Sequence, residues 1–380
     1  MHNFAPMKKV YLDNAATTAI RPEVIQEITR VMTEDFGNPS SIHSFGRNSK
    51  SILELSRKSI AKNLNAKAQE IIFTSGGTEG SNWILRSAIK DLNVKRIISS
   101  KIEHHAVLHV VESLEKEFDV QVDFVKIKPD GNIDVNHLVE LLSENIPTLV
   151  SLMHVNNETG NILDLELIGR ICKQHHAFFH SDSVQSVGKT VFNLQELPID
   201  FINASAHKFH GPKGIGFLFV RKGLIMNPMF FGGEQEKGLR AGTEAVHNIA
   251  GMAKALELSY QNLEAEKAQI ISLKNYFLNQ LEQHFPGFKI NGSKDGFYNI
   301  ANVLLPFDES KTSMILFHLD MKGIAVSRGS ACQSGSVKPS HVLAEMLDAS
   351  DIKKPSLRIS FSHYNTTEDV DYLIEVLKTI

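Results

Sequence analysis

The sequence predicts an α/β protein with two domains: a large one built on a mainly parallel, seven-stranded sheet, and a smaller α+β domain. Short apolar runs alternate with longer segments of helical spacing through the first two thirds of the chain, which is typical of helices packed on a parallel sheet. After Pro286 short strands and helices are mixed. The chain has 380 residues, 42% of them hydrophobic, enough for one large core or two coupled ones.

The alternating segments of the large domain follow one another in a regular order. The predicted strands are Glu70–Thr74, Arg96–Ser99, Val122–Ile127, Thr148–Met153, Ala177–His180, Phe201–Ala204 and Gly216–Val220. The predicted helices are Pro22–Phe36, Ser49–Leu64, Ala106–Glu117 and Leu165–His175. Pro22 suits a first helical position, because its missing N–H costs nothing there.

The last third of the chain has a different pattern. From Glu244 to His284 the apolar spacing is helical almost throughout, which predicts a long helix or a helix pair that bridges two domains. The final helix, Glu368–Ile380, follows Thr366, and Asp369 stands at the spacing of a capping box. Further strands are predicted at Asn299–Leu304, Gly323–Val326 and Leu357–Ser360.

Composition and charge exclude several classes of protein. With 40 Lys and Arg against 43 Asp and Glu, and no basic stripe, the sequence favours no nucleic-acid partner. No apolar run is long enough to span a membrane, and residues 1–10 lack the apolar stretch of a secretory signal. Two cysteines provide no disulfide framework, so a reducing cytoplasm is the expected location.

The 17 histidines raise the question of a metal site. The doublets His104-His105 and His175-His176 and the spacing of His207 and His210 match neither HExxH nor a paired Cys/His pattern. No metal is therefore expected.

An anion-binding turn is one interpretation of Ser75-Gly76-Gly77-Thr78-Glu79, which follows a predicted strand and precedes a helical stretch. Glycines let backbone N–H groups approach an anion, and the start of a helix adds a partial positive charge. The alternative is an ordinary tight turn between a strand and a helix, which the motif taken alone favours.

Lys208 is a candidate for covalent chemistry because it follows an apolar strand in a segment rich in glycine and histidine. A crowded amine of lowered pKa can form a Schiff base with a carbonyl group. The alternative is a solvated loop lysine.

Asp182 ends another predicted strand, where it can hold a heteroaromatic nitrogen protonated or cap a following helix. When Asp182 is considered alone, the helix cap is the favoured interpretation.

The two cysteines have different surroundings. Cys172 lies within an apolar helical segment and is interpreted as a packing residue. Cys332 stands among glycines and serines that cannot bury much of it, so its thiol is a candidate nucleophile, with a passive surface thiol as the equally weighted alternative.

Nine segments, in this order, together resemble the cysteine desulfurases. These are class-V aminotransferase-like, fold-type I enzymes that use pyridoxal 5′-phosphate (PLP). The segments are Tyr11–Thr18, Phe36–Ser41, Thr74–Glu79, Glu103–Val107, His154–Gly160, His180–Gly188, Ser205–Gly216, Leu239–Thr243 and Ser327–Ser334. The run around Cys332 is similar to that of the class with the longer cysteine loop. The resemblance covers the chain from about Val10 onward. It implies a PLP-binding domain at 18–260 and a small domain of 1–17 and 261–380 that carries the catalytic cysteine.

The resemblance assigns roles around the cofactor ring. Lys208 would bind PLP covalently, and Asp182 would pair with the pyridine nitrogen, keeping the ring a good electron sink. Gln185 would donate to the phenolic oxygen, with Asn157 beside the ring, near that oxygen and the substrate. His104 would stack on the ring and transfer protons.

Further roles concern the phosphate and the substrate. The phosphate would be held by Gly77, Thr78, Ser205 and His207, and by Thr243 from a second subunit, which implies a homodimer. Arg358 would bind the substrate carboxylate, because its planar fork matches that group.

The implied activity is removal of sulfur from L-cysteine to give L-alanine and a persulfide on Cys332. The persulfide would pass to an acceptor protein in iron–sulfur cluster assembly or thiolation. A selenocysteine lyase or a sulfinate lyase on the same scaffold is the alternative. A PLP aminotransferase needs no such thiol, and a scaffold subunit would have no need of Lys208, Asp182 and Cys332 together. Arg328 replaces a serine common in relatives and would lower the pKa of the Cys332 thiol if it came near.

Overall fold

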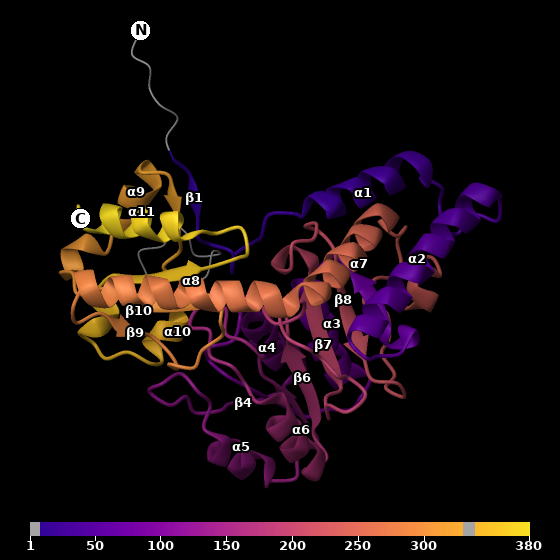
Figure 1. Cartoon of the computed structure of the whole chain (residues 1–380). Coiled ribbons are helices and arrows are strands. Elements are labelled where there is room, and N and C mark those ends of the chain that lie inside the picture. Colours follow the sequence, from indigo (N-terminus) through magenta and orange to yellow (C-terminus); the bar gives the residue numbers. More distant parts are fainter. Residues whose placement is uncertain (1–7, 330–338) are drawn as a thin grey trace.

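The chain folds into two lobes joined by a long helix (Figure 1). The computed structural model describes residues 8–329 and 339–380. The larger lobe holds the big sheet and its covering helices, and the smaller lobe contains the segments nearest both chain ends (Figure 1). Helix α8 (Leu263–His284) runs along the small lobe toward the large one.

The large sheet has seven strands among the described residues, in the order β2-β8-β7-β6-β5-β3-β4. Only β8 runs antiparallel to its neighbours, β2 and β7, so the expected mainly parallel sheet is confirmed. The strands are β2 (Ile71–Thr74), β3 (Arg96–Ser99), β4 (Gln121–Phe124), β5 (Thr148–Ser151), β6 (Phe178–Asp182), β7 (Phe201–Ser205) and β8 (Gly216–Val220).

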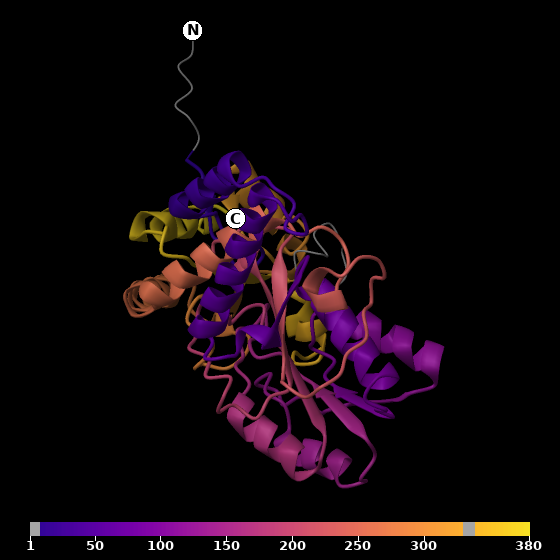
Figure 2. The same cartoon turned by 90° about the vertical axis from the view of Figure 1, so that its right-hand side faces the viewer.

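Helices cover both faces of this sheet (Figure 2). Successive strand residues enter opposite cores: Ile97 packs with α3 and α4, and Ile98 with the helices of the other face. Burial on both faces explains why the strands are continuous apolar runs. The helices on one face are α3 (Gly77–Lys90) and α4 (His105–Phe118), and those on the other are α1 (Pro22–Glu34), α2 (Ser44–Asn63), α5 (Val135–Leu142), α6 (Leu165–Gln174) and α7 (Val246–Gln261).

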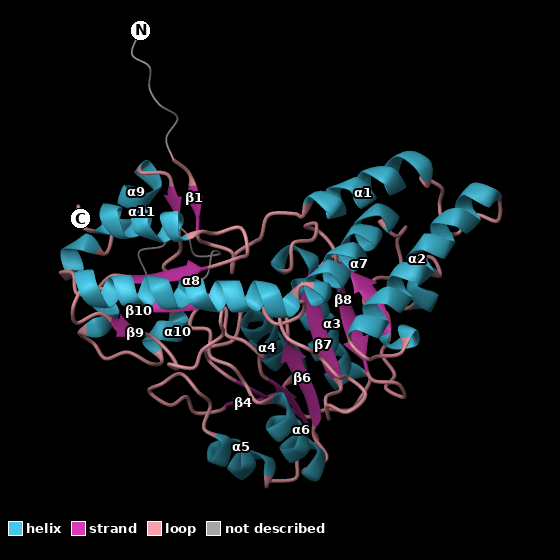
Figure 3. Ribbon diagram, in the orientation of Figure 1, coloured by secondary structure: helices cyan, strands magenta, loops and turns pink. Residues whose placement is uncertain are grey.

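The small lobe combines short strands and helices around its own core (Figure 3). An antiparallel sheet has the order β12-β10-β9, and a separate parallel pair joins β1 to β11. The strands are β1 (Val10–Tyr11), β9 (Lys289–Ile290), β10 (Ile300–Leu304), β11 (Ile324–Ala325) and β12 (Ser356–Ser360). The helices besides α8 are α9 (Ile315–Met321), α10 (His341–Ala344) and α11 (Thr367–Leu377). The domain limits at 17/18 and 260/261 stay a prediction.

Two expected helical regions can be compared with the structure. The pattern from Glu244 to His284, predicted as a long helix or a helix pair, forms the pair α7 and α8, which Asn262 separates. Helix α2 begins at Ser44, five residues before the apolar periodicity does, because the His43 side chain accepts a hydrogen bond from Gly46 N. The predicted capping box of Thr366 and Asp369 is present. No described helix combines the length and the apolar character needed to cross a membrane.

Candidate active site

One cavity lies where the parallel strands end, and it brings together most of the expected site residues. Strand β6 ends at Asp182 and strand β7 at Ser205, and in parallel sheets ligands bind beyond such carboxyl ends. The cavity is lined by Ala15, Ala16, Gly77, Thr78, His104, Ala106, Met153, Val155, Asn157, Asp182, Val184, Gln185, Ser205, His207, Lys208 and Arg358. All the expected cofactor- and substrate-binding residues except Thr243 are in this set.

Lys208 reaches the cavity from a 3₁₀ turn, Ala206–Lys208, that follows β7 directly. Its Nζ donates to the carbonyl oxygens of Ala15 (2.7 Å) and Ala16 (2.8 Å). The amine therefore has a fixed position inside the cavity, and the interpretation of Lys208 as a solvated loop lysine is wrong.

Asp182 lies buried at the end of β6. Burial raises the pKa of its carboxyl group, while the Val184 N–H, the His180 ring and the Lys208 amine act in the opposite direction. Its Oδ1 accepts from Val184 N at 3.0 Å, but residues 184–189 form turns rather than a helix. The helix-cap interpretation is therefore wrong.

A polar layer supports Asp182 from the neighbouring strands. The buried His180 ring pairs with Ser151 Oγ through Nδ1 and with Asn203 Oδ1 through Nε2, both at 2.9 Å. Burial lowers the pKa of His180, so its ring is neutral near pH 7. The ring's hydrogen bonds to β5 and β7 keep these three strands in register below the cavity.

His104 stands at the start of α4, where its Nδ1 accepts from Ala106 N at 3.1 Å. Burial lowers the pKa of His104 to about 4, and the Lys208 charge adds to the effect. The imidazole is therefore neutral near pH 7, with Nε2 protonated because Nδ1 is an acceptor. Behind it, burial raises the pKa of Glu103 to about 8. Glu103 Oε1 accepts from Met153 N at 2.9 Å and so holds the segment before His104 against the end of β5.

The turn at Gly76 and Gly77, at the start of α3, forms a cradle on the wall of the cavity. Gly76 has φ +151°, which L side chains rarely adopt. A Cβ on Gly77 would lie 2.6 Å from Val184 Cγ2, and Gly77 N donates to Ser205 Oγ at 2.7 Å. Glu79 fastens the turn, because its carboxylate accepts from Ser75 N at 2.8 Å. The strand–turn–helix geometry predicted for this motif is confirmed.

His207 and Gln185 complete the wall beside Lys208. Burial lowers the pKa of His207 to about 4, helped by the Lys208 charge, and its Nδ1 lies 3.1 Å from Thr17 Oγ1. Gln185 Nε2 donates to Ala15 O at 2.8 Å. Ala15 O therefore accepts from both Gln185 and Lys208.

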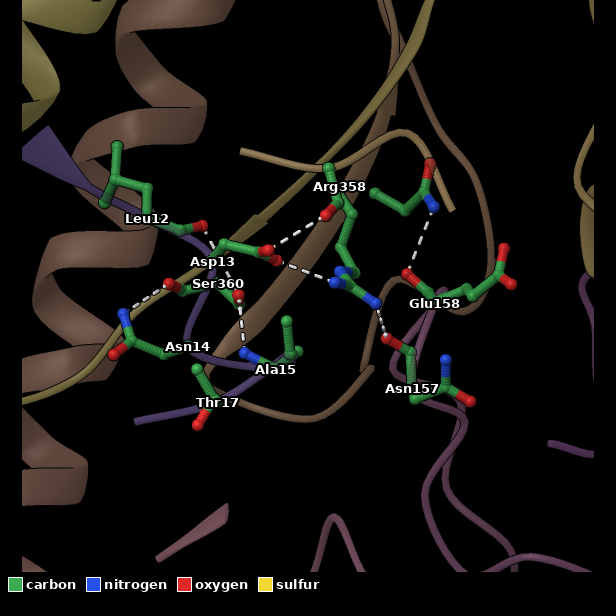
Figure 4. Close-up of polar contacts among 12 residues, drawn as sticks. Leu12, Asp13, Asn14, Ala15, Thr17, Asn157, Glu158, Arg358 and Ser360 are labelled. Atoms are coloured by element: carbon green, nitrogen blue, oxygen red, sulfur yellow. Dashed lines mark hydrogen bonds and ion pairs between the residues drawn. The ribbon is translucent and has the colours of Figure 1, made fainter. Parts of the chain in front are cut away.

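Arg358 enters the cavity from β12 and is almost fully buried; Figure 4 shows its side chain between Asp13 and Asn157. Its Nη2 lies 2.7 Å from Asp13 Oδ1, and its Nη1 donates to Asn157 O at 2.9 Å. Arg358 Nε is buried without a hydrogen-bond partner among the described residues. The guanidinium is thus held in one orientation and keeps donor capacity for an anion.

Thr243 is exposed and lies apart from the cavity that contains Lys208. It lines a second cavity with Thr74, Ser75 and Arg240, among others. Arg240 Nε lies 3.0 Å from Glu79 Oε1, so the segment before Thr243 is tied to the turn that precedes α3.

Cys332 lies outside the described residues. Arg328, the nearest described cation before it, donates from Nη1 to Thr312 O at 2.9 Å. Cys172 is buried in the large core, and burial raises the pKa of its thiol. Its interpretation as a packing residue is confirmed.

No cluster of three or more His, Cys, Asp or Glu in the described parts of the chain is arranged to hold a metal ion.

Sequence reasoning missed several residues that shape the site. The sequence did not indicate which residues contact Arg358 and Lys208. Their partners are Asp13, Ala15 and Ala16, which the sequence shows only as parts of a motif, because contacts across more than 190 positions leave no periodic signal. Glu103 and Lys189 are buried ionisable residues, and only their burial distinguishes them from the solvated residues of the same types.

Comparison with known proteins agrees with this geometry. The family model described as Aminotransferase class-V matches residues 10–373. A cysteine desulfurase IscS of Dictyoglomus turgidum is 41% identical over 98% of this chain and 94% of its own length. A putative cysteine desulfurase IscS 1 of Bacillus subtilis is 42% identical, with 96% of each chain covered.

Solved structures show the same architecture. A NifS-like protein superposes with a TM-score of 0.89 at 34% identity, covering 98% of this chain and all of its own. SspA in complex with cysteine gives a TM-score of 0.81 at 29% identity, over 94% of this chain and 100% of that one. The chain therefore belongs to the aminotransferase class-V family and, within it, to the cysteine desulfurases, which are PLP-dependent enzymes. The expected family, fold-type and enzyme class are confirmed.

Proposed function

We propose that this enzyme removes sulfur from L-cysteine, releases L-alanine and leaves a persulfide on Cys332. The observation that carries the proposal is the convergence of Lys208, Asp182, His104 and Arg358 on one cavity. A relative of known structure is described as a complex with cysteine, and the chemistry of these four side chains suits an amino acid with a carboxylate and an amine.

The residues of the cavity fit PLP. The buried acid Asp182 suits a pyridinium nitrogen, and the cradle at Gly77 with Ser205 and His207 suits a phosphate. Lys208 would hold the cofactor covalently, since its amine lies in the cavity. When bound, PLP supplies an electron sink that stabilises negative charge at the substrate carbon next to the amine.

Lys208 and His104 are the groups that would move protons. The Lys208 amine would carry a proton away from the substrate Cα, because it lies inside the cavity. His104 is neutral because burial lowers its pKa to about 4, so its ring can stack on the cofactor and exchange a proton with the substrate. Gln185 would donate to the phenolic oxygen, and Asn157 would lie beside it.

Arg358 would bind the substrate carboxylate. Its guanidinium is fixed by Asp13 and Asn157 O, which aligns the remaining donors before the substrate arrives. Binding in this way would direct the substrate amine toward Lys208 and leave its sulfur open to attack.

Sulfur transfer would be a displacement at the substrate sulfur. The Cys332 thiolate attacks that sulfur and forms an S–S bond as the carbon–sulfur bond breaks. The electron pair returns to the substrate Cβ, which takes up a proton and becomes the methyl group of L-alanine. The transferred sulfur stays on Cys332 as a persulfide, ready for an acceptor.

We also propose a homodimer in which Thr243 completes the phosphate site of the second subunit. Thr243 is exposed and lies outside the Lys208 cavity of its own chain, which leaves it available to another copy. The sulfur acceptor we propose is a protein of iron–sulfur cluster assembly or thiolation. A nucleic acid or a membrane is not proposed as a partner, and the cytoplasmic location stays a prediction.

The test is to incubate the purified protein with L-cysteine and to follow alanine, sulfide and protein-bound sulfur together. Wild type should form alanine, and Cys332→Ala should form none while it keeps the visible absorption of bound PLP. Cys172→Ala, which removes the buried packing cysteine, is the matched control and should remain active. Full alanine formation from cysteine by Cys332→Ala would contradict the proposal. The same variant should be assayed with L-selenocysteine, and activity on that substrate alone would favour a selenocysteine lyase.

A further inference from the structure

A buried lysine, Lys189, lies behind the wall of the cavity and has no part in the mechanism above. It ends the turn that follows β6. Gly188, just before it, has φ +76°, and a Cβ there would lie 2.7 Å from Phe209 Cβ. Tyr260 of α7 donates from its hydroxyl to Thr190 O at 3.1 Å. These contacts on both sides keep the Lys189 backbone in place.

The Lys189 amine is held against Gln185. Its Nζ donates to Gln185 Oε1 at 3.4 Å, and it forms no ion pair with a carboxylate of the described residues. The charged groups facing it are cationic or basic: Lys208 and His207 from the 3₁₀ turn, and His210 just after that turn. Burial lowers the pKa of Lys189 to about 7, with a further contribution from Lys208.

We propose that Lys189 is a positioning residue: it fixes the Gln185 amide in the orientation that presents Nε2 to the cofactor side, and its charge lowers the proton affinity at position 208. The proposal rests on the proposed binding of PLP at Lys208. Lys189 is not part of the cavity lining, and it acts only through Gln185 and Lys208.

The positioning part follows from hydrogen-bond chemistry. A primary amide can turn over and exchange its oxygen with its nitrogen, and only its partners decide which orientation is stable. In its protonated form the Lys189 amine can only donate, so it selects Oε1 of Gln185. Gln185 Nε2 then points to Ala15 O, the same oxygen that accepts from Lys208. One N–H of the Gln185 amide is left for the cofactor.

The electrostatic part follows from the burial of the Lys189 amine behind the cavity that contains Lys208. A like charge nearby disfavours protonation of an amine, and the Lys208 charge contributes to the lowered pKa of Lys189. An anionic cofactor oxygen near Gln185 would gain from the same positive potential. Lys189 should therefore favour binding of the cofactor and an unprotonated nitrogen at position 208.

The test uses the holoenzyme, two variants and a control. Lys189→Met removes both the hydrogen bond and the charge. Lys189→Gln removes the charge and keeps an amide N–H that can donate to Gln185 Oε1. The matched control is Lys274→Met, because Lys274 is another amine whose pKa burial lowers, to about 8, and neither Lys274 nor its acceptor Phe297 O is part of the cavity lining. The readouts are the pH midpoint of the visible absorption of bound PLP, the PLP dissociation constant and the melting temperature.

Both Lys189 variants should move the midpoint to higher pH, by about one unit, because a buried like charge has been removed. Lys189→Met should also weaken PLP binding about tenfold, whereas Lys189→Gln should bind nearly as wild type does. Lys274→Met should change neither value. An unmoved midpoint in both variants, or a lower melting temperature alone, would overturn the inference. If Lys189→Met does not fold, the Lys189→Gln midpoint decides. A wild-type protein without PLP absorption would instead contradict the proposed function itself.

Discussion

Asp13 and Arg358 form an ion pair at the edge of the active-site cavity, with Asp13 Oδ1 2.7 Å from Arg358 Nη2 (Figure 4). Asp13 follows β1 and Arg358 lies in β12, so the pair links the two ends of the chain within the small lobe. Ser327 Oγ also donates to Asp13 Oδ2 at 3.0 Å. The carboxylate thus orients the guanidinium that we propose for substrate binding, and it partly balances the buried charge.

Removal of Asp13 should weaken substrate binding more than it slows chemistry. Asp13→Ala frees one side of the Arg358 guanidinium, so the aligned donors are lost and KM for L-cysteine should rise about tenfold with a smaller change in kcat. Steady-state alanine formation measures both constants.

The conservative variant separates orientation from charge. Asp13→Asn keeps an oxygen for Arg358 and should change KM only a few fold, because the hydrogen bond remains. An Asp13→Ala enzyme with wild-type KM would show that Arg358 does not depend on Asp13 for its orientation.

A second buried ion pair joins Arg57 to Glu236 in the large lobe. We expect it to contribute strongly to the free energy of unfolding. Arg57 Nη2 lies 2.7 Å from Glu236 Oε1, and Glu236 Oε2 also accepts from Phe73 N at 2.9 Å. Glu236→Leu should destabilise the fold by about 3 kcal/mol, because Phe73 N loses its acceptor and the buried Arg57 keeps only the longer pair with Glu54, 3.3 Å from Nε to Oε2. The double variant Arg57→Met, Glu236→Leu should recover part of that loss. Urea unfolding measures both, and a double variant no better than the single one would contradict this account.

The fold could be predicted largely from the sequence because both faces of the large sheet are buried. Strands such as Arg96–Ser99 and Gly216–Val220 therefore appear as apolar runs with the observed limits. Helix ends were less predictable, since they depend on caps. His43 begins α2 through a side-chain contact that apolar periodicity does not reveal. Residue Asn262 breaks the long helical pattern between α7 and α8 without glycine or proline.

The candidate site was predictable only as a set of motifs. Lys208 and Asp182 each had a structural alternative. The hydrogen bonds of the Lys208 amine inside the cavity exclude the solvated lysine, and the turns at residues 184–189 exclude the helix cap at Asp182. The pairing of Arg358 with Asp13 spans 345 positions, so neither periodicity nor spacing could indicate it. The orientation of Arg358 and the environment of Lys189 therefore come from tertiary structure alone.

The Ser205 hydroxyl should be important for cofactor affinity. It accepts from Gly77 N at 2.7 Å and so shapes the cradle at the start of α3. Ser205→Ala leaves the Gly77 N–H without this partner, and the PLP dissociation constant should rise about tenfold. The matched control is Ser99→Ala, because buried Ser99 Oγ donates to Ser151 O within the sheet and away from the cavity. Fluorescence titration of the apoenzymes measures the difference, and equal affinities for the two variants would contradict the role of Ser205.

His154 should make the protein sensitive to acid. Its ring is buried 5.5 Å from the Phe192 ring, and burial lowers its pKa from 6.5 to about 4, with Asp164 acting in the opposite direction. The unfolded chain binds this proton at a higher pH than the folded chain, so stability falls as pH drops from 6.5 toward 4 and is unaffected above 6.5. His154→Phe keeps an aromatic ring and removes the proton site. It should therefore reduce the acid-induced loss by about 3 kcal/mol at pH 4, whereas the exposed control His284→Gln should not. Melting temperatures measured from pH 8 to 4 test this, and parallel curves for wild type and His154→Phe would show that His154 titrates alike in both states.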